Sequence, residues 1–191
     1  MKKSTVAITI VLIVVIVGVV GVYAIMTGRA KTEAAKTVMT PVQEALSRDL
    51  EKDYPATVKE VVKYYTELEK CFYNEDCTEE EIEQLGMQAR ALFDEELLAN
   101  NDVGTYLMRL KKDIQSFRDA KRRISTVAVA SSTSVKFFEQ DDYEFAKIYC
   151  GYAVRDNTGK SLIAGRVYLL RRNSDRQWKI YGWEDADAVD N

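Results

Sequence analysis

The sequence predicts an α+β fold, in which an N-terminal transmembrane helix is followed by helices that pack on a four-stranded antiparallel sheet. Residues 4–28 carry no charged side chain, which is typical of a membrane span. Apolar residues then recur with a helical period as far as Ile124, and with a period of two after it. Helices that precede a run of strands are the order of an α+β domain.

The uncharged run is long enough to cross a bilayer once. Thr5–Met26 is 22 residues long and would span roughly 33 Å as a helix, against about 30 Å for a bilayer core. We therefore assign residues 1–28 to a transmembrane anchor, with lipid as the partner of residues 5–26. The start, middle and end of this span are marked by Val6, Ile16 and Met26.

A cleaved signal peptide and the reverse orientation are the alternatives to this anchor. Val22-Tyr23-Ala24 resembles a weak cleavage site, although the apolar core of a signal peptide would be only about 7–15 residues. Lys2 and Lys3 nearly balance Arg29 and Lys31, so the positive-inside count does not decide the orientation. A short basic tail before an apolar run is typical of a signal-anchor, and large domains translocate largely regardless of charge. We expect a cell-membrane protein whose C-terminal domain is extracytoplasmic.

Composition argues against catalysis, metal binding and nucleic-acid binding. Histidine is absent, which removes the commonest general base and the usual metal ligand. Four cations and no acid precede Thr32, so residues 32–191 carry a net charge of −7 where the whole chain carries −3. An acidic domain disfavours nucleic acid. Because the motifs of nucleotide, serine, zinc and thiol chemistry are also absent, the sequence predicts a non-enzymatic protein without a cofactor.

Residues 29–54 are expected to form a helical stalk between the anchor and the domain. Arg29–Met39 is rich in Ala, Lys and Glu. Thr40-Pro41 has the N-cap and N1 residues of a helix start, which predicts a helix over Pro41–Lys52. The domain would then occupy residues 55–185, and residues 186–191 would form an acidic tail.

Three longer helices are predicted inside the domain. Capping boxes at Thr57-x-x-Glu60 and Thr78-x-x-Glu81 open two of them, and the first covers Val58–Phe72 with one apolar face. The third covers Val103–Lys121. Its far side is basic, but acids are interleaved there, which indicates a solvated face.

Four long strands are predicted after the helices, joined by turns rich in Asp, Asn and Gly. Such short turns indicate consecutive hairpins. The strands cover Ser125–Phe138, Tyr143–Arg155, Ser161–Arg172 and Gln177–Glu184. Both faces of the sheet carry large side chains, and an exposed apolar face commonly marks an interface. The sequence therefore predicts a protein interface, or a homodimer contact, formed by Phe145, Tyr149, Tyr168, Tyr181 and Trp183.

Three cysteines cannot make a closed disulfide framework. Cys71 and Cys77 flank a short loop and would pair in an oxidising compartment, whereas buried free thiols are the alternative, because Cys behaves as a small hydrophobe. Cys150 lies in a predicted strand with no partner.

The domain resembles the nuclear transport factor 2-like superfamily over about residues 55–185. The resemblance rests on the opening helix, on Leu92-Phe93…Leu97-Leu98, and on two strands, Gly165-Arg166-Val167-Tyr168-Leu169-Leu170-Arg171 and Gln177-Trp178-Lys179-Ile180-Tyr181-Gly182-Trp183. It implies a curved, cone-like sheet in a bacterial protein. The cone of that superfamily often holds a pocket, where enzymes place Asp or His; the candidate carboxylates here are Asp94, Glu95 and Glu144. Because no catalytic dyad matches, the resemblance implies a non-enzymatic interaction module.

Three functions remain open from the sequence. The first is a single-pass membrane protein that displays its domain for protein–protein interaction or self-association. The second is a cone that binds a small apolar ligand, or acts on it as ketosteroid isomerase-like proteins do. These two differ in whether the space between helices and sheet is left open beside a buried acid, or is filled by Tyr152, Trp178 and Phe137. The third is an accessory subunit of a cell-envelope assembly.

Overall fold

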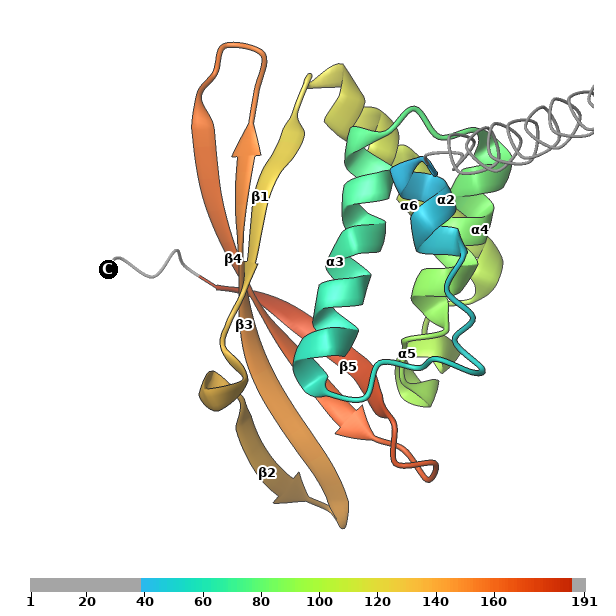
Figure 1. The fold of residues 1–191 in the computed structure, drawn as a ribbon, viewed down its shortest axis with the longest axis vertical. Helices are drawn as coiled ribbons and strands as arrows, with labels where there is room; N and C mark the ends of the chain where they lie inside the picture. Colours follow the sequence, from blue (N-terminus) through green and yellow to red (C-terminus); the bar gives the residue numbers. More distant parts are fainter. Residues whose placement is uncertain (1–38, 187–191) are drawn as a thin grey trace, which may run out of the picture. The chain divides into compact units, whose positions relative to one another are not determined.

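The computed structural model describes residues 39–186 and confirms the α+β class. Within this range five α-helices precede a five-stranded antiparallel sheet (Figure 1). No helix of the described part is long and apolar enough to cross a bilayer. The anchor predicted around Val6, Ile16 and Met26 lies outside the described residues and stays a prediction, as does the tail beyond residue 186.

Polar caps fix where each helix begins. The helices are α2 (Pro41–Leu46), α3 (Val58–Asn74), α4 (Glu79–Arg90), α5 (Glu95–Ala99) and α6 (Val103–Asp119). The capping boxes predicted at Thr57 and Thr78 are confirmed, and Thr40 forms a third box with Gln43. Asp94 and Asp102 cap α5 and α6, because their carboxylates accept backbone N–H groups of the first turn.

The sheet has five strands and not four, because the strand predicted over Ser125–Phe138 is two strands. The strands are β1 (Arg123–Val129), β2 (Lys136–Gln140), β3 (Tyr143–Arg155), β4 (Ser161–Arg172) and β5 (Trp178–Ala186). A 3-10 turn over Ser132–Ser134 separates β1 from β2, since the Ser131 hydroxyl accepts the Thr133 N–H and replaces a strand partner. Both short strands pair with β3, which is 13 residues long.

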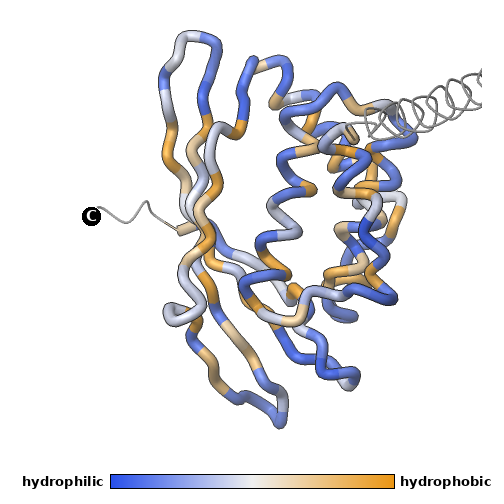
Figure 2. Tube along the Cα trace, in the orientation of Figure 1, coloured by the Kyte–Doolittle hydropathy of each residue, from blue (hydrophilic) through white to orange (hydrophobic). Residues whose placement is uncertain are grey.

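The helices cover one face of the sheet, and α3 lies along it (Figure 1). The apolar side of α3, with Val61, Leu68 and Phe72, is buried against sheet residues such as Ile148 and Leu170. Apolar residues recur along both layers in Figure 2, as two amphipathic layers packed on one core require.

Helix α2 belongs to the folded domain, which corrects part of the predicted stalk. Val42 and Ala45 are buried, and the Tyr64 hydroxyl on α3 donates to the Ala45 carbonyl at 2.8 Å. The compact unit begins at Thr40, so the stalk predicted for residues 29–54 does not extend over residues 40–54. A helix of 6 residues is too short to be stable alone, so its apolar side packs on α3 and α4. It ends before Lys52 because Asp49 forms a separate turn, in which its carboxylate accepts the Glu51 N–H and its carbonyl accepts the Asp53 N–H.

Candidate functional site

The aromatic residues predicted to form one interface lie on two faces of the sheet. Tyr168 and Trp183 point toward the helices, where the Tyr65 ring lies 5.8 Å from the first ring and 5.9 Å from the second. Phe145 and Tyr149 alternate along β3 with residues of the helix-facing side, so they point away from the helices. The structure corrects the prediction for Tyr168 and Phe145, because both side chains are buried.

The outward-facing members of that set pack against their own sheet. Tyr181 lies edge-on to Phe145 with the ring centroids 5.5 Å apart. Tyr149 lies over Gly165, where a Cβ atom would be 2.6 Å from the tyrosine Oη and 2.9 Å from the Ala186 carbonyl oxygen. Gly165 is therefore required for the close approach of the Tyr149 ring. Tyr149 and Tyr181 are half-buried, so only part of each ring could contact a partner protein.

Three exposed aromatic side chains lie on the β2–β3 hairpin, with Phe137 on its helix-facing side and with Phe138 and Tyr143 on the opposite side. Phe137 is 64% exposed, Tyr143 is 45% exposed and Phe138 is 36% exposed. The turn consists of Asp141 and Asp142, both with positive φ, as a two-residue hairpin turn requires. Figure 1 shows that this hairpin extends past the N-terminal end of α3. We call Phe137, Phe138 and Tyr143 the aromatic hairpin.

The rings of the aromatic hairpin are held in fixed positions. Phe138 stacks on Phe145 with 5.5 Å between centroids and 13° between planes, and the Phe137 centroid lies 5.7 Å from that of Trp178. A hollow of about 500 Å³ lies beside these rings. Its rim includes Arg172, whose Nη1 donates to Glu144 at 2.7 Å. Positioned aromatic rings with a charged rim are typical of the centre of a protein interface.

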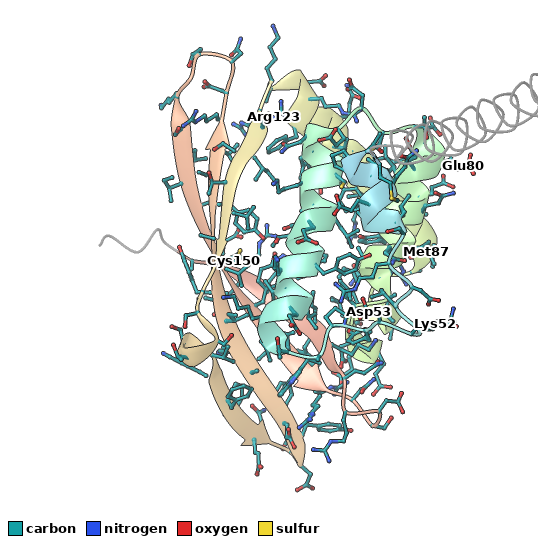
Figure 3. The ribbon with its side chains drawn as sticks, viewed as in Figure 1. Lys52, Asp53, Glu80, Met87, Arg123 and Cys150 are labelled. Carbon is teal, nitrogen blue, oxygen red and sulfur yellow. The ribbon has the colours of Figure 1, made fainter. Side chains whose placement is uncertain are left out.

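A second feature is a buried polar cluster between α3 and the sheet. The Glu69 carboxylate on α3 accepts a hydrogen bond from the Tyr152 hydroxyl at 2.7 Å and one from Arg166 Nη1 at 2.8 Å. The Tyr152 and Tyr168 hydroxyl oxygens are 2.6 Å apart. In Figure 3, side chains occupy the space between α3 and the strands, with Cys150 on the sheet side.

The electrostatics of this cluster keep the phenols protonated. Burial raises the pKa of Glu69, while Arg166 and the hydrogen bonds from the two tyrosines oppose that rise. Burial, together with the nearby Glu69 charge, raises the pKa of Tyr152 and Tyr168 far above the usual range of a tyrosine. Both hydroxyls can therefore donate to the carboxylate, and the buried charge is paired and hydrogen-bonded, as a buried charge must be.

The interior contains a buried acid, but its surroundings are filled. Tyr152 and Trp178 are buried as predicted for a filled cone, whereas Phe137 is exposed on the hairpin and does not fill it. Of the predicted pocket carboxylates, Asp94 is buried against Arg171, while Glu95 and Glu144 are exposed. Across residues 39–186, no group of three or more His, Cys, Asp or Glu side chains is placed to hold a metal ion.

Sequence reasoning missed Glu69, Arg166 and the exposed position of Phe137. Glu69 follows Tyr65 by four residues on the apolar face of α3, and a polar residue at such a position signals a buried polar contact. Arg166 shares a face of β4 with Tyr168, which is the same signal in a strand. The exposure of Phe137 depends on where α3 begins relative to the hairpin, which no local sequence pattern records.

Comparison with known families places the chain in one of them. Residues 1–183 match the family described as a domain of unknown function, DUF6715, and the chain belongs to that family. A comparison with curated proteins gives no match.

Proposed function

We propose that this chain is a single-pass membrane-anchored, non-enzymatic protein whose α+β domain serves protein–protein interaction or self-association through the aromatic hairpin. The observation that carries the proposal is the 64% exposure of Phe137 beside the fixed ring of Trp178. Full burial of a phenylalanine is worth about 1.5–3 kcal/mol, so covering the exposed part of this ring would contribute roughly 1–2 kcal/mol to binding.

The anchor part of the proposal is supported by the uncharged run over residues 4–28. We propose that the domain is extracytoplasmic, because a very short basic tail before an apolar run is typical of a signal-anchor. Protease added to intact cells tests this placement, with a cytoplasmic protein as the control for cell integrity. We expect loss of the domain while the control stays intact; full protection of the domain in cells, together with cleavage after lysis, would overturn the orientation.

The interaction part is tested by changing the aromatic hairpin in the full chain. The variant Phe137→Ser/Phe138→Ser removes two exposed rings, and Leu162→Ser/Ile163→Ser is the matched control, because those residues are 59% and 55% exposed on another hairpin. Affinity capture and size measurement of the protein taken from its own membrane are the assays. We expect the partner or second copy to be lost with the first variant only. Equal retention by both variants would count against the proposal.

A second candidate function is the binding of a small apolar ligand between α3 and the sheet. The feature that favours it is the buried acid Glu69, which two tyrosine hydroxyls accompany. The membership of the nuclear transport factor 2-like superfamily, which suggested such a site, stays a prediction. Binding of an apolar fluorophore by the wild type and not by Glu69→Gln would favour this function over the first.

A further inference from the structure

A separate groove of about 800 Å³ lies beside α3, between α2 and the start of β1. Figure 3 places Arg123 at the end of the sheet opposite the β2–β3 hairpin, so this groove is distinct from the aromatic hairpin. Lys70 of α3, Arg123 of β1 and Arg155 of β3 line one end of the groove. We call these three residues the basic end.

The basic end is held together by a clamp between α3 and β1. The Asn74 side chain donates to the Ile124 carbonyl at 2.9 Å and accepts the Ile124 N–H at 2.9 Å. This clamp brings the last turn of α3, which carries Lys70, against the first residues of β1. The three cations therefore come from three elements whose relative positions are fixed.

Two of these cations face each other directly. Arg123 pairs with Arg155 in the β1–β3 ladder, and like charges directly opposite each other destabilise a sheet. By contrast, Arg48, Arg166, Arg171 and Arg172 each have a carboxylate within ion-pair distance. Over the described range, the ion pairs within 4.0 Å include none made by the basic end.

The groove is also lined by four acids, and two of them already have a cation within ion-pair distance. Asp53 pairs with Arg48 at 3.3 Å, and Glu67 lies 3.9 Å from Lys63. Glu44 on α2 and Glu75 at the end of α3 line the groove as well. Glu67 lies one turn before Lys70 on α3, and Glu75 follows Asn74, so the basic end has three cations beside two carboxylates, one of which also contacts Lys63.

From this arrangement we infer that the basic end binds a phosphate group. A guanidinium presents parallel N–H donors that match phosphate oxygens, and an ammonium adds a point charge. A bound phosphate would lie between Arg123 and Arg155, where its negative charge would attract both guanidinium groups and offset the repulsion between them. The phosphate could belong to a soluble compound or to a lipid headgroup.

The lipid source is within reach of the groove, and this step alone rests on the proposed anchor. Pro41 lines the groove, and the predicted span ends at Met26. The chain between these residues can extend to at most about 50 Å. Phosphate binding itself needs neither the anchor nor the aromatic hairpin.

The test uses the full chain in a non-ionic detergent, titrated with inorganic phosphate at constant ionic strength. The readout is the thermal unfolding midpoint, which a ligand of the folded state raises. The variant is Arg123→Gln/Arg155→Gln, and Lys160→Gln is a control that removes one charge from an exposed turn. We expect the midpoint to rise with phosphate for the wild type and the control, and the double variant to bind at least tenfold more weakly.

A readout without phosphate separates binding from folding. Because the two arginines repel each other, the double variant should unfold in chloride at a midpoint no lower than that of the wild type. A variant that melts lower in chloride, an equal phosphate response in variant and wild type, or no response in the wild type would each overturn the inference. None of these outcomes affects the affinity-capture experiment on the aromatic hairpin, so phosphate binding and partner binding are tested independently.

The source of the phosphate is decided in lipid nanodiscs. Amide hydrogen exchange at Arg123–Ser125 is compared between phosphatidylcholine alone and phosphatidylcholine with phosphatidylglycerol. Slower exchange with the anionic lipid, lost in the double variant, assigns the site to headgroups. A response to soluble phosphate without a response to lipid assigns it to a soluble phosphate compound.

Discussion

Replacement of Arg171 by methionine should destabilise the domain by about 3–5 kcal/mol, because it leaves Asp94 as a buried charge without its partner. The two side chains are only 5% and 3% exposed. Arg171 donates to both carboxylate oxygens of Asp94, from Nη2 at 2.5 Å and from Nε at 2.9 Å. Its guanidinium also lies 4.6 Å from the Tyr143 ring, so the same residue supports the aromatic hairpin.

The loss of stability depends on whether one member of the Arg171–Asp94 pair is replaced or both are. Arg171→Met leaves the Asp94 carboxylate buried, whereas Asp94→Asn leaves Arg171 bonded to Glu96 at 2.6 Å, so its cost should be smaller. In the double variant, the loss of unfolding free energy should be smaller by at least about 2 kcal/mol than the sum of the losses in the two single variants. For a domain of this size, 3–5 kcal/mol corresponds to a fall of about 6–20 °C in the unfolding midpoint.

Urea and thermal unfolding of the full chain in detergent, followed by tryptophan fluorescence, measure these effects. Arg172→Met is the control, because Arg172 is half-buried and its partner Glu144 is exposed, which predicts a cost below about 1 kcal/mol. Equal costs for the two arginine variants, or strict additivity in the Arg171–Asp94 cycle, would refute the reasoning.

Three further predictions concern the core. Because burial raises the pKa of Glu69 in the folded state above its unfolded value, its protonated form favours folding; the stability of the wild type relative to Glu69→Gln should fall as pH rises through that raised pKa. Urea unfolding from pH 4 to pH 8 measures the difference, and parallel profiles would contradict it. Gly165→Ala should cost about 1–3 kcal/mol, because its Cβ would meet the Tyr149 ring, and an unchanged midpoint would contradict the close approach. Burial raises the pKa of all three thiols to about 11, so native protein at pH 7.5 should react with iodoacetamide far more slowly than protein in urea. Mass spectrometry measures this for Cys71, Cys77 and Cys150, which are free in the structure.

Much of the fold follows from local sequence patterns. Thr57 and Thr78 begin their helices because each has a glutamate three residues later, and that reciprocal capping is visible in the sequence. The Asp141–Asp142 turn was also visible as a short polar break between apolar runs. The break between β1 and β2 was not, because Ser131–Ser134 interrupts a strand only when the neighbouring strand is long enough to pair on both sides.

The candidate site was less accessible to sequence reasoning than the fold. Alternation along β3 and β4 correctly separates two faces, but it does not say which face the helices cover. Alternation therefore predicts Tyr168 at the interface although it is buried, and Phe137 is named among the residues that would fill a closed cone although it is exposed. Both errors have one cause: the length and placement of α3 over the sheet are tertiary properties.

The most direct measurement of the central claim is photo-crosslinking from the aromatic hairpin in the native membrane. A photoreactive phenylalanine analogue is placed at Phe137 in the full chain, and a second protein carries it at Ile163, which is 55% exposed on another hairpin, against 64% for Phe137. The account predicts a specific crosslinked species from position 137, either a dimer of this chain or a complex with one partner, and none from position 163. Absence of a product at position 137, or equal products at both positions, would contradict it.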